Sequence, residues 1–234
     1  MSDATAPRAR DRVGPIGRFF RTGIRRTVRG RLRGVWARGG PDGLWTDDAP
    51  ESDGFVWAAN HHGWWDGFVA VVPLWDRGRT VRVLVDPDSL ARFGVLRHLG
   101  GVPANRVRDA VRLLQRGGIV VIFPEGELKP AGPLGEVRPG ADWLLHASGA
   151  PGWAVATRVV LRGHEAAEAY LDFAPVGDRP VGEVLAQRLA DLDADLAAAD
   201  PRRPLPGFRE LVRGTRSWDE RLAALRGRRE GATS

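Results

Sequence analysis

From residue 55 onward, short apolar runs alternate along the chain with longer segments in which apolar residues recur at helical spacing. The clearest run is I-V-V-I-F-P-E-G at 119–126, a continuous β-branched stretch whose strand is expected to end at Pro124. Strands that are apolar throughout are typical of sheets covered by helices on both faces. The alternation therefore predicts an α/β fold, with a mixed, largely parallel sheet flanked by helices.

Glycine and proline delimit the individual elements. Pro73 is expected to end the short helix that follows the first strand, because proline disrupts a helix interior. The predicted strands are 55–59, 80–86, 119–126, 153–161 and 169–174. The predicted helices are 64–72, 87–100, 105–118, 140–150, a segment along 185–196, and 207–226.

Length and composition limit the class of protein. The 234 residues fit one domain with a terminal extension, and a hydrophobic content of 43% is enough for a sizeable core. The chain has no cysteine, which excludes disulfides, thiolate nucleophiles and cysteine-ligated zinc. This composition fits a reducing cytoplasm.

The basic charge is concentrated at the N-terminus. Residues 1–40 contain 11 Arg and 2 Asp, a net charge of +9, whereas the remainder has 24 basic and 27 acidic residues, a net charge of −3. Apolar residues in this arm recur at steps of three and four, so they share one face of a predicted amphipathic helix. These positions are Ile16, Phe19, Phe20, Ile24, Val28, Leu32, Val35 and Trp36.

The pattern divides the chain into a basic amphipathic helix over 1–40, a Pro- and acid-rich linker over 41–53, and a globular domain over 54–234. An arginine-rich helix with an apolar face suits a membrane surface that contains anionic lipid. Packing on the chain's own domain and nucleic-acid binding are the alternatives, and the apolar face argues against a duplex as partner. No run predicts a membrane-spanning helix or a signal peptide.

Two polar motifs follow predicted strands. N-H-H-G-W-W-D at 60–66 comes after the strand at 55–59, and F-P-E-G-E at 123–127 comes at the end of the strand that begins at 119. Functional groups of α/β sheets collect at the carboxyl ends of strands. The two motifs are therefore expected to share one site.

His61 and Asp66 form the candidate catalytic pair. A neutral imidazole can accept a proton from a hydroxyl, and a carboxylate that fixes its tautomer makes it a better base. Because the chain has no cysteine and no G-x-S-x-G motif, the attacking group is expected to be a hydroxyl of the substrate itself. A metal site formed by His61, His62 and Asp66, and a purely structural role for this turn, are the alternatives.

The F-P-E-G-E motif offers complementary groups. Gly126 allows a close approach of the backbone, and Glu125 offers carboxylate oxygens to substrate hydroxyls. Backbone N–H groups in such a turn can hold an anion or a developing oxyanion.

These motifs, in this order, resemble those of the glycerolipid acyltransferases, the 1-acylglycerol-3-phosphate (PlsC-like) acyltransferase family. N-H-H-G-W-W-D is similar to the family's H-x4-D block. The segment L-A-R-F-G-V-L-R-H-L-G-G-V-P-A-N-R, which ends at Arg106, is similar to the second block. I-F-P-E-G-E is similar to the third block, and G-A-P-G-W-A-V-A, with Pro151, to the fourth. The resemblance covers residues 53–176.

The resemblance implies a glycerol-3-phosphate acyltransferase-like fold. It also implies transfer of a fatty acyl group from acyl-CoA or acyl carrier protein to a hydroxyl of a lysophospholipid-like or other lipid acceptor. His61 would be the general base with Asp66 as its partner, and Arg106, Glu125 and Gly126 would bind the acceptor. No cofactor and no metal are implied.

The family also predicts a location. Its soluble members hold an N-terminal helical segment against the membrane surface. The protein is therefore expected to be peripheral, on the cytoplasmic face of the cell membrane, with no nucleic acid as partner.

The chain departs from the family pattern after the third block. The family commonly continues F-P-E-G-T-R-S, whereas this chain has Glu127 and Leu128 in place of Thr and Arg, and Lys129 as the nearest cation. A carboxylate beside a phosphate site is unfavourable. A non-phosphorylated glycosylated lipid is therefore an alternative acceptor. A non-catalytic α/β lipid- or nucleic-acid-binding module is the alternative of a different class.

Overall fold

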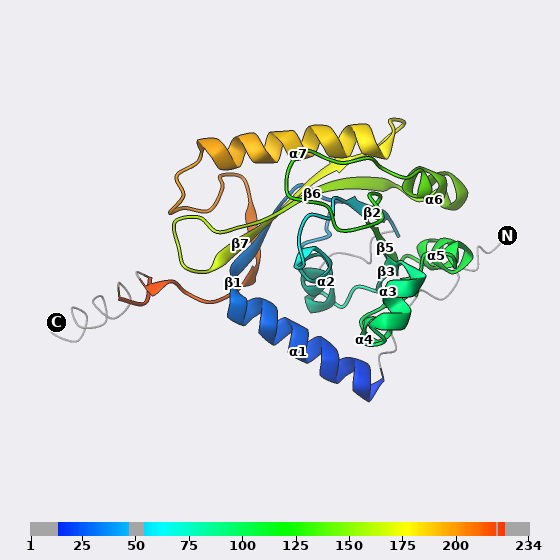
Figure 1. The fold of residues 1–234 in the computed structure, drawn as a ribbon, viewed down its shortest axis with the longest axis horizontal. Helices are drawn as coiled ribbons and strands as arrows, with labels where there is room; N and C mark the ends of the chain where they lie inside the picture. Colours follow the sequence, from blue (N-terminus) through cyan, green and yellow to red (C-terminus); the bar gives the residue numbers. More distant parts are fainter. Residues whose placement is uncertain (1–13, 47–53, 219, 223–234) are drawn as a thin grey trace.

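An eight-stranded sheet forms the centre of the molecule (Figure 1). The structure is a computed structural model that describes residues 14–46, 54–218 and 220–222. The strands lie in the order β4-β3-β5-β2-β6-β7-β1-β8. Their bounds are β1 Leu32–Arg38, β2 Val56–Ala59, β3 Val81–Val85, β4 Gly101–Pro103, β5 Ile119–Ile122, β6 Gly152–Val160, β7 Ala167–Pro175 and β8 Arg209–Arg213.

Most neighbouring strands run parallel. Strands β4, β3, β5, β2 and β6 point in one direction, and β7 returns antiparallel to β6. Strand β1 is parallel to β7, and β8 is antiparallel to β1. The predicted mixed, largely parallel sheet is confirmed.

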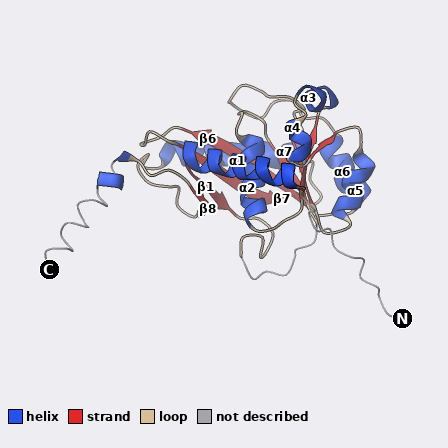
Figure 2. Cartoon of the chain, turned by 90° about the horizontal axis from the view of Figure 1, so that it is seen from below, coloured by secondary structure: helices blue, strands red, loops and turns tan. Residues whose placement is uncertain are grey.

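Helices cover both faces of this sheet. Helices α1 and α2 lie on one face, and α5, α6 and α7 lie on the other (Figures 1 and 2). Their bounds are α1 Pro15–Arg31, α2 Asp66–Asp76, α3 Pro87–Arg92, α4 Val95–His98, α5 Val107–Leu114, α6 Gly140–Ser148 and α7 Val181–Ala198.

Strand β2 shows why a strand without polar alternation is stable in this fold. Trp57 and Ala59 belong to the core beneath α1 and α2, whereas Val56 and Ala58 face the cores beneath α5, α6 and α7. All four side chains are buried. Because β2 is held between two helical layers, the residues that follow it occupy a fixed place at the edge of the sheet.

Helix α2 continues past its predicted end. The expectation that Pro73 would end it is wrong, because the helix runs to Asp76 with Pro73 inside it. A proline inside a helix removes a backbone hydrogen bond. The neighbouring Val72, Leu74 and Trp75 are buried in the core, and this packing offsets the loss.

Two further helix predictions are corrected. The helix predicted over 87–100 is two short helices, α3 and α4, separated at Phe93 and Gly94. The segment predicted as a helix over 207–226 instead contains strand β8, which pairs with β1. The spacing of apolar residues within a segment carries no information about a distant strand that can pair with it. Here the pairing with β1 decides that the segment forms a strand. Strand β4, with three residues, is too short to leave a recognisable pattern.

The N-terminal segment is a helix followed by a strand. Helix α1 ends at Arg31, and the remainder of the predicted helix, with Val35 and Trp36, lies in β1. Val35 joins the core beneath α1 and α2, and Trp36 joins the core beneath α7. The central sheet therefore includes part of the segment that the sequence pattern assigned to a helical arm over 1–40. Residues 1–13 of that arm and 47–53 of the predicted linker lie outside the described part.

One face of α1 packs on the chain's own domain. Arg25 Nε and Arg29 Nη2 each lie 2.7 Å from a carboxylate oxygen of Asp76, at the end of α2. The Arg21 guanidinium lies 4.7 Å from the centre of the Trp75 ring. In the described ranges, no helix combines the length and the apolar character needed to cross a membrane.

Candidate active site

The two polar motifs meet at one edge of the sheet. Strands β2 and β5 are parallel neighbours, with Ala58 opposite Ile122, so their carboxyl ends lie side by side. The turns that follow bring His61 next to Glu125. The backbone N–H of His61 donates a 2.7 Å hydrogen bond to Glu125 Oε1. The structure thus brings both motifs together.

Asp66 lies in the first turn of helix α2, where a carboxylate is favoured, and its side chain holds the loop that contains His61 and His62. Its Oδ2 lies 3.1 Å from His61 Nδ1. The same oxygen accepts the backbone N–H groups of His62 and Gly63, each at 2.8 Å. A carboxylate only accepts, so in the neutral imidazole of His61 the proton lies on Nδ1 and Nε2 has the free lone pair.

The His61 ring is supported on one face and partly open to solvent. It stacks on Phe123, with ring centroids 4.5 Å apart and an angle of 26° between the planes. The side chain is 28% exposed. No described residue forms a hydrogen bond with Nε2, so this nitrogen can take a proton from a bound hydroxyl.

Asn60 fixes the start of the turn. It is fully buried, its side-chain N–H donates to the Thr157 carbonyl at 3.0 Å, and its Oδ1 accepts the Thr157 N–H at 2.7 Å. Through these side-chain bonds, the link between β2 and β6 continues one residue beyond the end of β2. Asn60 was not among the residues predicted for the site. The available signal was a polar side chain directly after four apolar strand positions.

Glu125 faces the chain itself. Its side chain is fully buried. Besides the His61 N–H, it accepts from the Gly135 N–H at 3.2 Å and from the His62 ring at 3.1 Å, both on Oε2. These contacts tie Glu125 to the backbone of His61 and Gly135, and its predicted role in acceptor binding stays a prediction.

Gly126 has a positive φ of +76°. A Cβ at this position would lie 2.7 Å from the central carbon of the Arg138 guanidinium. Glycine therefore lets both the turn and the arginine side chain take their places. Arg138 is exposed, and sequence analysis missed it because it follows the motif by 12 positions.

Arg106 lies farther from the pair. It is exposed at the start of α5, after β4, and β4 is separated from β5 by β3. Since β4 is parallel to β3, Arg106 lies at the same edge of the sheet as His61. No hydrogen bond or ion pair among the described residues joins its side chain to His61, Asp66 or Glu125. Its predicted role in acceptor binding stays a prediction.

His62 belongs to a second set of contacts that sequence analysis did not predict. Its Nδ1 lies 2.7 Å from Nη1 of Arg158, which comes from β6. Arg158 also pairs with Asp193 of α7 through bonds of 2.6 and 2.7 Å. The adjacent histidine pair was the only sequence signal, because Arg158 and Asp193 are distant along the chain.

The geometry does not support the alternative of a metal site. His61 and His62 point to different carboxylates, Asp66 and Glu125. Within the described residues, no group of three or more His, Asp or Glu side chains is placed to hold a metal ion.

Comparisons with known proteins identify a family domain in the chain and a solved structure with a similar fold. Residues 46–156 match the family model described as Acyltransferase. That segment contains both the histidine motif and the F-P-E-G motif. No curated protein matches the chain.

Among solved structures, the chain is similar to the crystal structure of the 1-acyl-sn-glycerophosphate (LPA) acyltransferase, PlsC, from Thermotoga maritima. The two are 19% identical, with a TM-score of 0.51, and the match covers 76% of this chain and 78% of that chain. At this identity the match shows the fold, whereas the family model gives the class of protein. The chain therefore contains an acyltransferase domain over residues 46–156 and has a PlsC-like fold.

Proposed function

We propose that this acyltransferase moves a fatty acyl group from acyl-CoA or acyl carrier protein to a hydroxyl of a lysophospholipid-type acceptor, with His61 as general base. The observation that carries the proposal is the 3.1 Å contact between His61 Nδ1 and Asp66 Oδ2, which in the neutral imidazole favours the tautomer with its lone pair on Nε2. The family match supports acyl transfer, and the relative from Thermotoga maritima is named for a 1-acyl-sn-glycerophosphate acceptor.

The reaction is a direct transfer between two bound substrates. His61 Nε2 takes the proton of the acceptor hydroxyl as its oxygen attacks the thioester carbonyl carbon. The tetrahedral intermediate then collapses, the C–S bond breaks, and the leaving thiolate takes the proton from the imidazolium. Asp66 stabilises the imidazolium and keeps the ring in its orientation.

Charges around the F-P-E-G turn favour an acceptor with an anionic group. Lys129 Nζ donates to Glu127, and this hydrogen bond lowers the pKa of Glu127. Arg138 lies across Gly126 and forms no ion pair with a described residue. Lys129 and Arg138 therefore lie beside Glu127, which offsets the unfavourable effect expected from its charge. This balance supports a lysophospholipid-type acceptor over a neutral glycosylated lipid.

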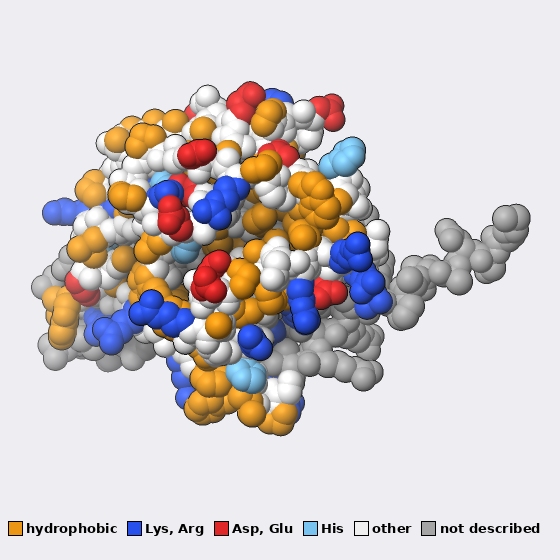
Figure 3. All heavy atoms as spheres, turned by 45° about the vertical axis from the view of Figure 1, so that its right-hand side comes forward, with side chains coloured by type: hydrophobic (Ala, Val, Ile, Leu, Met, Phe, Trp, Pro, Cys, Tyr) orange, Lys and Arg blue, Asp and Glu red, His pale blue; other side chains and the backbone are white. Residues whose placement is uncertain are grey.

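A patch of exposed apolar side chains supports attachment to a membrane. This apolar end patch consists of Ile16 and Phe19 on α1, and Phe93 and Val95 beside the turn between α3 and α4. Aromatic stacking between α1 and α4 holds these two helices together. Figure 3 shows apolar side chains gathered at the lower end of the molecule, next to basic ones. Such a surface suits the headgroup layer of anionic lipid on the cytoplasmic face of the cell membrane.

Product analysis tests the proposed function. Purified protein is given acyl-CoA or acyl carrier protein, together with vesicles that contain either a lysophospholipid or a non-phosphorylated glycosylated lipid. We expect the lysophospholipid to be acylated at least about tenfold faster, because only it offers an anion to the two cations. Preference for the glycosylated lipid would overturn the acceptor assignment. Absence of product with every pair would favour a non-catalytic lipid-binding module.

A further inference from the structure

His62 is a buried titratable residue that the proposed mechanism does not use. Its side chain is only 4% exposed, although the base next to it is partly open to solvent. Both ring nitrogens have partners within the chain. Nδ1 lies 2.7 Å from Arg158 Nη1, and Nε2 lies 3.1 Å from Glu125 Oε2.

These two partners fix the position of the proton on His62. A guanidinium has only N–H donors, so Nδ1 must accept. A carboxylate only accepts, so Nε2 carries the proton and donates it to Glu125. A doubly protonated ring would place a second N–H and a second positive charge against Arg158. The ring is therefore neutral and forms a bridge that runs from Arg158 to Glu125.

The bridge ends at the backbone of the catalytic base. Glu125 accepts from the His62 ring on Oε2 and from the His61 N–H on Oε1. The backbone carbonyl of His61 is held as well, because it accepts a 2.8 Å hydrogen bond from the Lys129 N–H. The position of His61 relative to the F-P-E-G turn therefore depends on where the Glu125 carboxylate lies.

The other end of the bridge is anchored in the sheet and in α7. Arg158 is 8% exposed and lies on β6, next to β2. Its guanidinium donates two bonds to Asp193 and a 2.7 Å bond to the Gly132 carbonyl. Gly132 belongs to the loop that follows F-P-E-G, so Arg158 holds that loop as well as the His62 ring.

We propose that His62 is a positioning residue for acyl transfer: its neutral ring, oriented by Arg158, sets the Glu125 carboxylate and through it the backbone of His61. This inference rests on the proposed role of His61 as base. His62 itself makes no contact with substrate. Misplacement of a reacting group by about 1 Å can lower a rate by about 10²-fold. Loss of the bridge should therefore lower kcat and spare acceptor binding.

Substitutions at His62 separate positioning from folding. We expect His62→Ala to lower kcat by about 30- to 100-fold, with the acceptor KM changed less than about twofold. His62→Gln can still donate to Glu125 and should recover most of the rate. His62→Asn is too short to reach Glu125 and should not. His146→Ala, an exposed histidine on α6, is the matched control and should keep the wild-type kcat. Thermal unfolding of each protein reports on the fold.

Two further measurements examine the bridge itself. Nitrogen-15 NMR of the ring should show His62 protonated on Nε2 and not on Nδ1. If His62 and Arg158 act as a unit, combining His62→Ala with Arg158→Met should lower kcat no further than the worse single change. Wild-type kcat in His62→Ala and His62→Asn, a proton on Nδ1, or additive losses would overturn the proposal. An inactive wild-type protein would instead refute the proposed function.

Discussion

At the scale of single residues, the tautomer of His61 depends on the hydrogen bond that Asp66 Oδ2 accepts from Nδ1. An asparagine at position 66 can present an N–H to Nδ1, which would leave the ring proton on Nε2 and remove the base. We expect Asp66→Asn to lower kcat by roughly 10³- to 10⁴-fold, as tautomer changes in such pairs do. Steady-state kinetics with thermal unfolding checks this. A kcat within tenfold of wild type would contradict the tautomer argument.

Gly126 can be tested against a matched glycine. Gly126 and Gly149 have φ values of +76° and +65°, but a Cβ at 149 meets nothing within 4 Å, whereas one at 126 meets Arg138. We expect Gly149→Ala to cost about 1 kcal/mol of unfolding free energy and to leave kcat unchanged. Gly126→Ala should cost more and lower kcat/KM, because it displaces Arg138. Urea unfolding measures the loss of stability in both variants, and steady-state kinetics measures kcat/KM. Equal effects of the two substitutions would show that Arg138 does not contribute to acyl transfer.

At the scale of elements, one face of helix α1 packs on the domain. The helix also presents Ile16 and Phe19, two of the four residues of the apolar end patch, to solvent. We expect Phe19→Ser to weaken binding to vesicles with anionic lipid by about tenfold, since burial of one Phe contributes about 1.5 kcal/mol. Leu161→Ser is the control, because Leu161 is 69% exposed but lies outside the patch. Vesicle co-sedimentation measures both. Equal binding by the two variants would mean that α1 does not meet the membrane.

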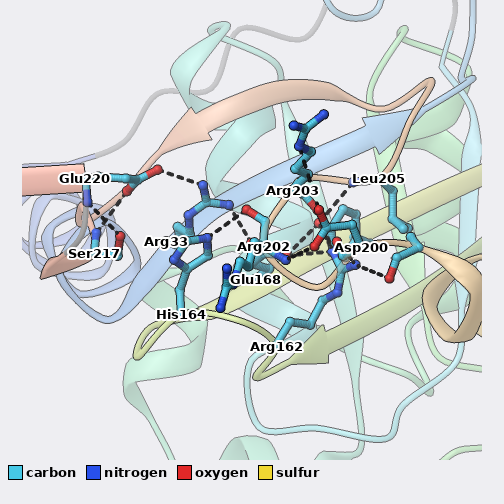
Figure 4. Close-up of polar contacts among 12 residues, drawn as sticks. Arg33, Arg162, His164, Glu168, Asp200, Arg202, Arg203, Leu205, Ser217 and Glu220 are labelled. Carbon is cyan, nitrogen blue, oxygen red and sulfur yellow. Dashed lines mark hydrogen bonds and ion pairs between the residues drawn. The ribbon is translucent and has the colours of Figure 1, made fainter. Parts of the chain in front are cut away.

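A buried ion network joins β1, β7 and the segment after β8 (Figure 4). Glu168 pairs with Arg33 at 2.5 Å and with Arg162 at 3.1 Å, and Arg33 also pairs with Glu220 at 2.7 Å. Tyr170 donates its hydroxyl proton to Glu168. Burial, together with this bond, raises the pKa of the Tyr170 hydroxyl above its usual range. The network pairs the buried Glu168 with two arginines, although Arg33 Nε has no hydrogen-bond partner among the described residues.

Glu220 makes this network sensitive to acid. Burial alone would raise its pKa, but hydrogen bonds from Arg33 and the Ser217 backbone outweigh burial and lower it. A carboxyl group with a lowered pKa stabilises the folded state above its unfolded pKa, and this stabilisation is lost as pH falls through the folded value. The side chain is 37% exposed, so solvent screening keeps the contribution below about 1 kcal/mol.

We therefore expect Glu220→Gln to have a lower unfolding free energy than wild type at pH 7, and the difference to shrink as pH falls through the lowered pKa of Glu220 and the carboxyl group becomes protonated. Urea unfolding over a series of pH values from 7 downward measures this. A difference that stays constant with pH would show that the charge of Glu220 does not contribute.

At the scale of the whole molecule, the sequence could predict features that are local or that follow from parallel topology. The strands at 55–59 and 119–126 were recognisable because they are apolar throughout, and their carboxyl ends were expected to meet. The strand within 207–226 and the position of β1 between β7 and β8 could not be predicted, because both depend on pairing between strands that are distant along the chain.

The same distinction holds for the site. His61 and Asp66 are five positions apart, so their pairing could be predicted from a single motif. His62 and Arg158 are 96 positions apart, and only the fold brings them together. Glu125 was predicted to bind the acceptor, and nothing in the sequence indicated that its buried carboxylate would also accept hydrogen bonds from the backbone of His61 and Gly135.

The proposed function depends most on His61 being the general base for acyl transfer. The most direct test compares wild-type protein with His61→Ala, using acyl-CoA and lysophospholipid vesicles and measuring the acylated product. We predict a loss of at least about 10³-fold in kcat, within the range typical of a lost general base, with unchanged thermal unfolding and vesicle binding. Formation of the same product at the wild-type rate by His61→Ala would contradict the claim.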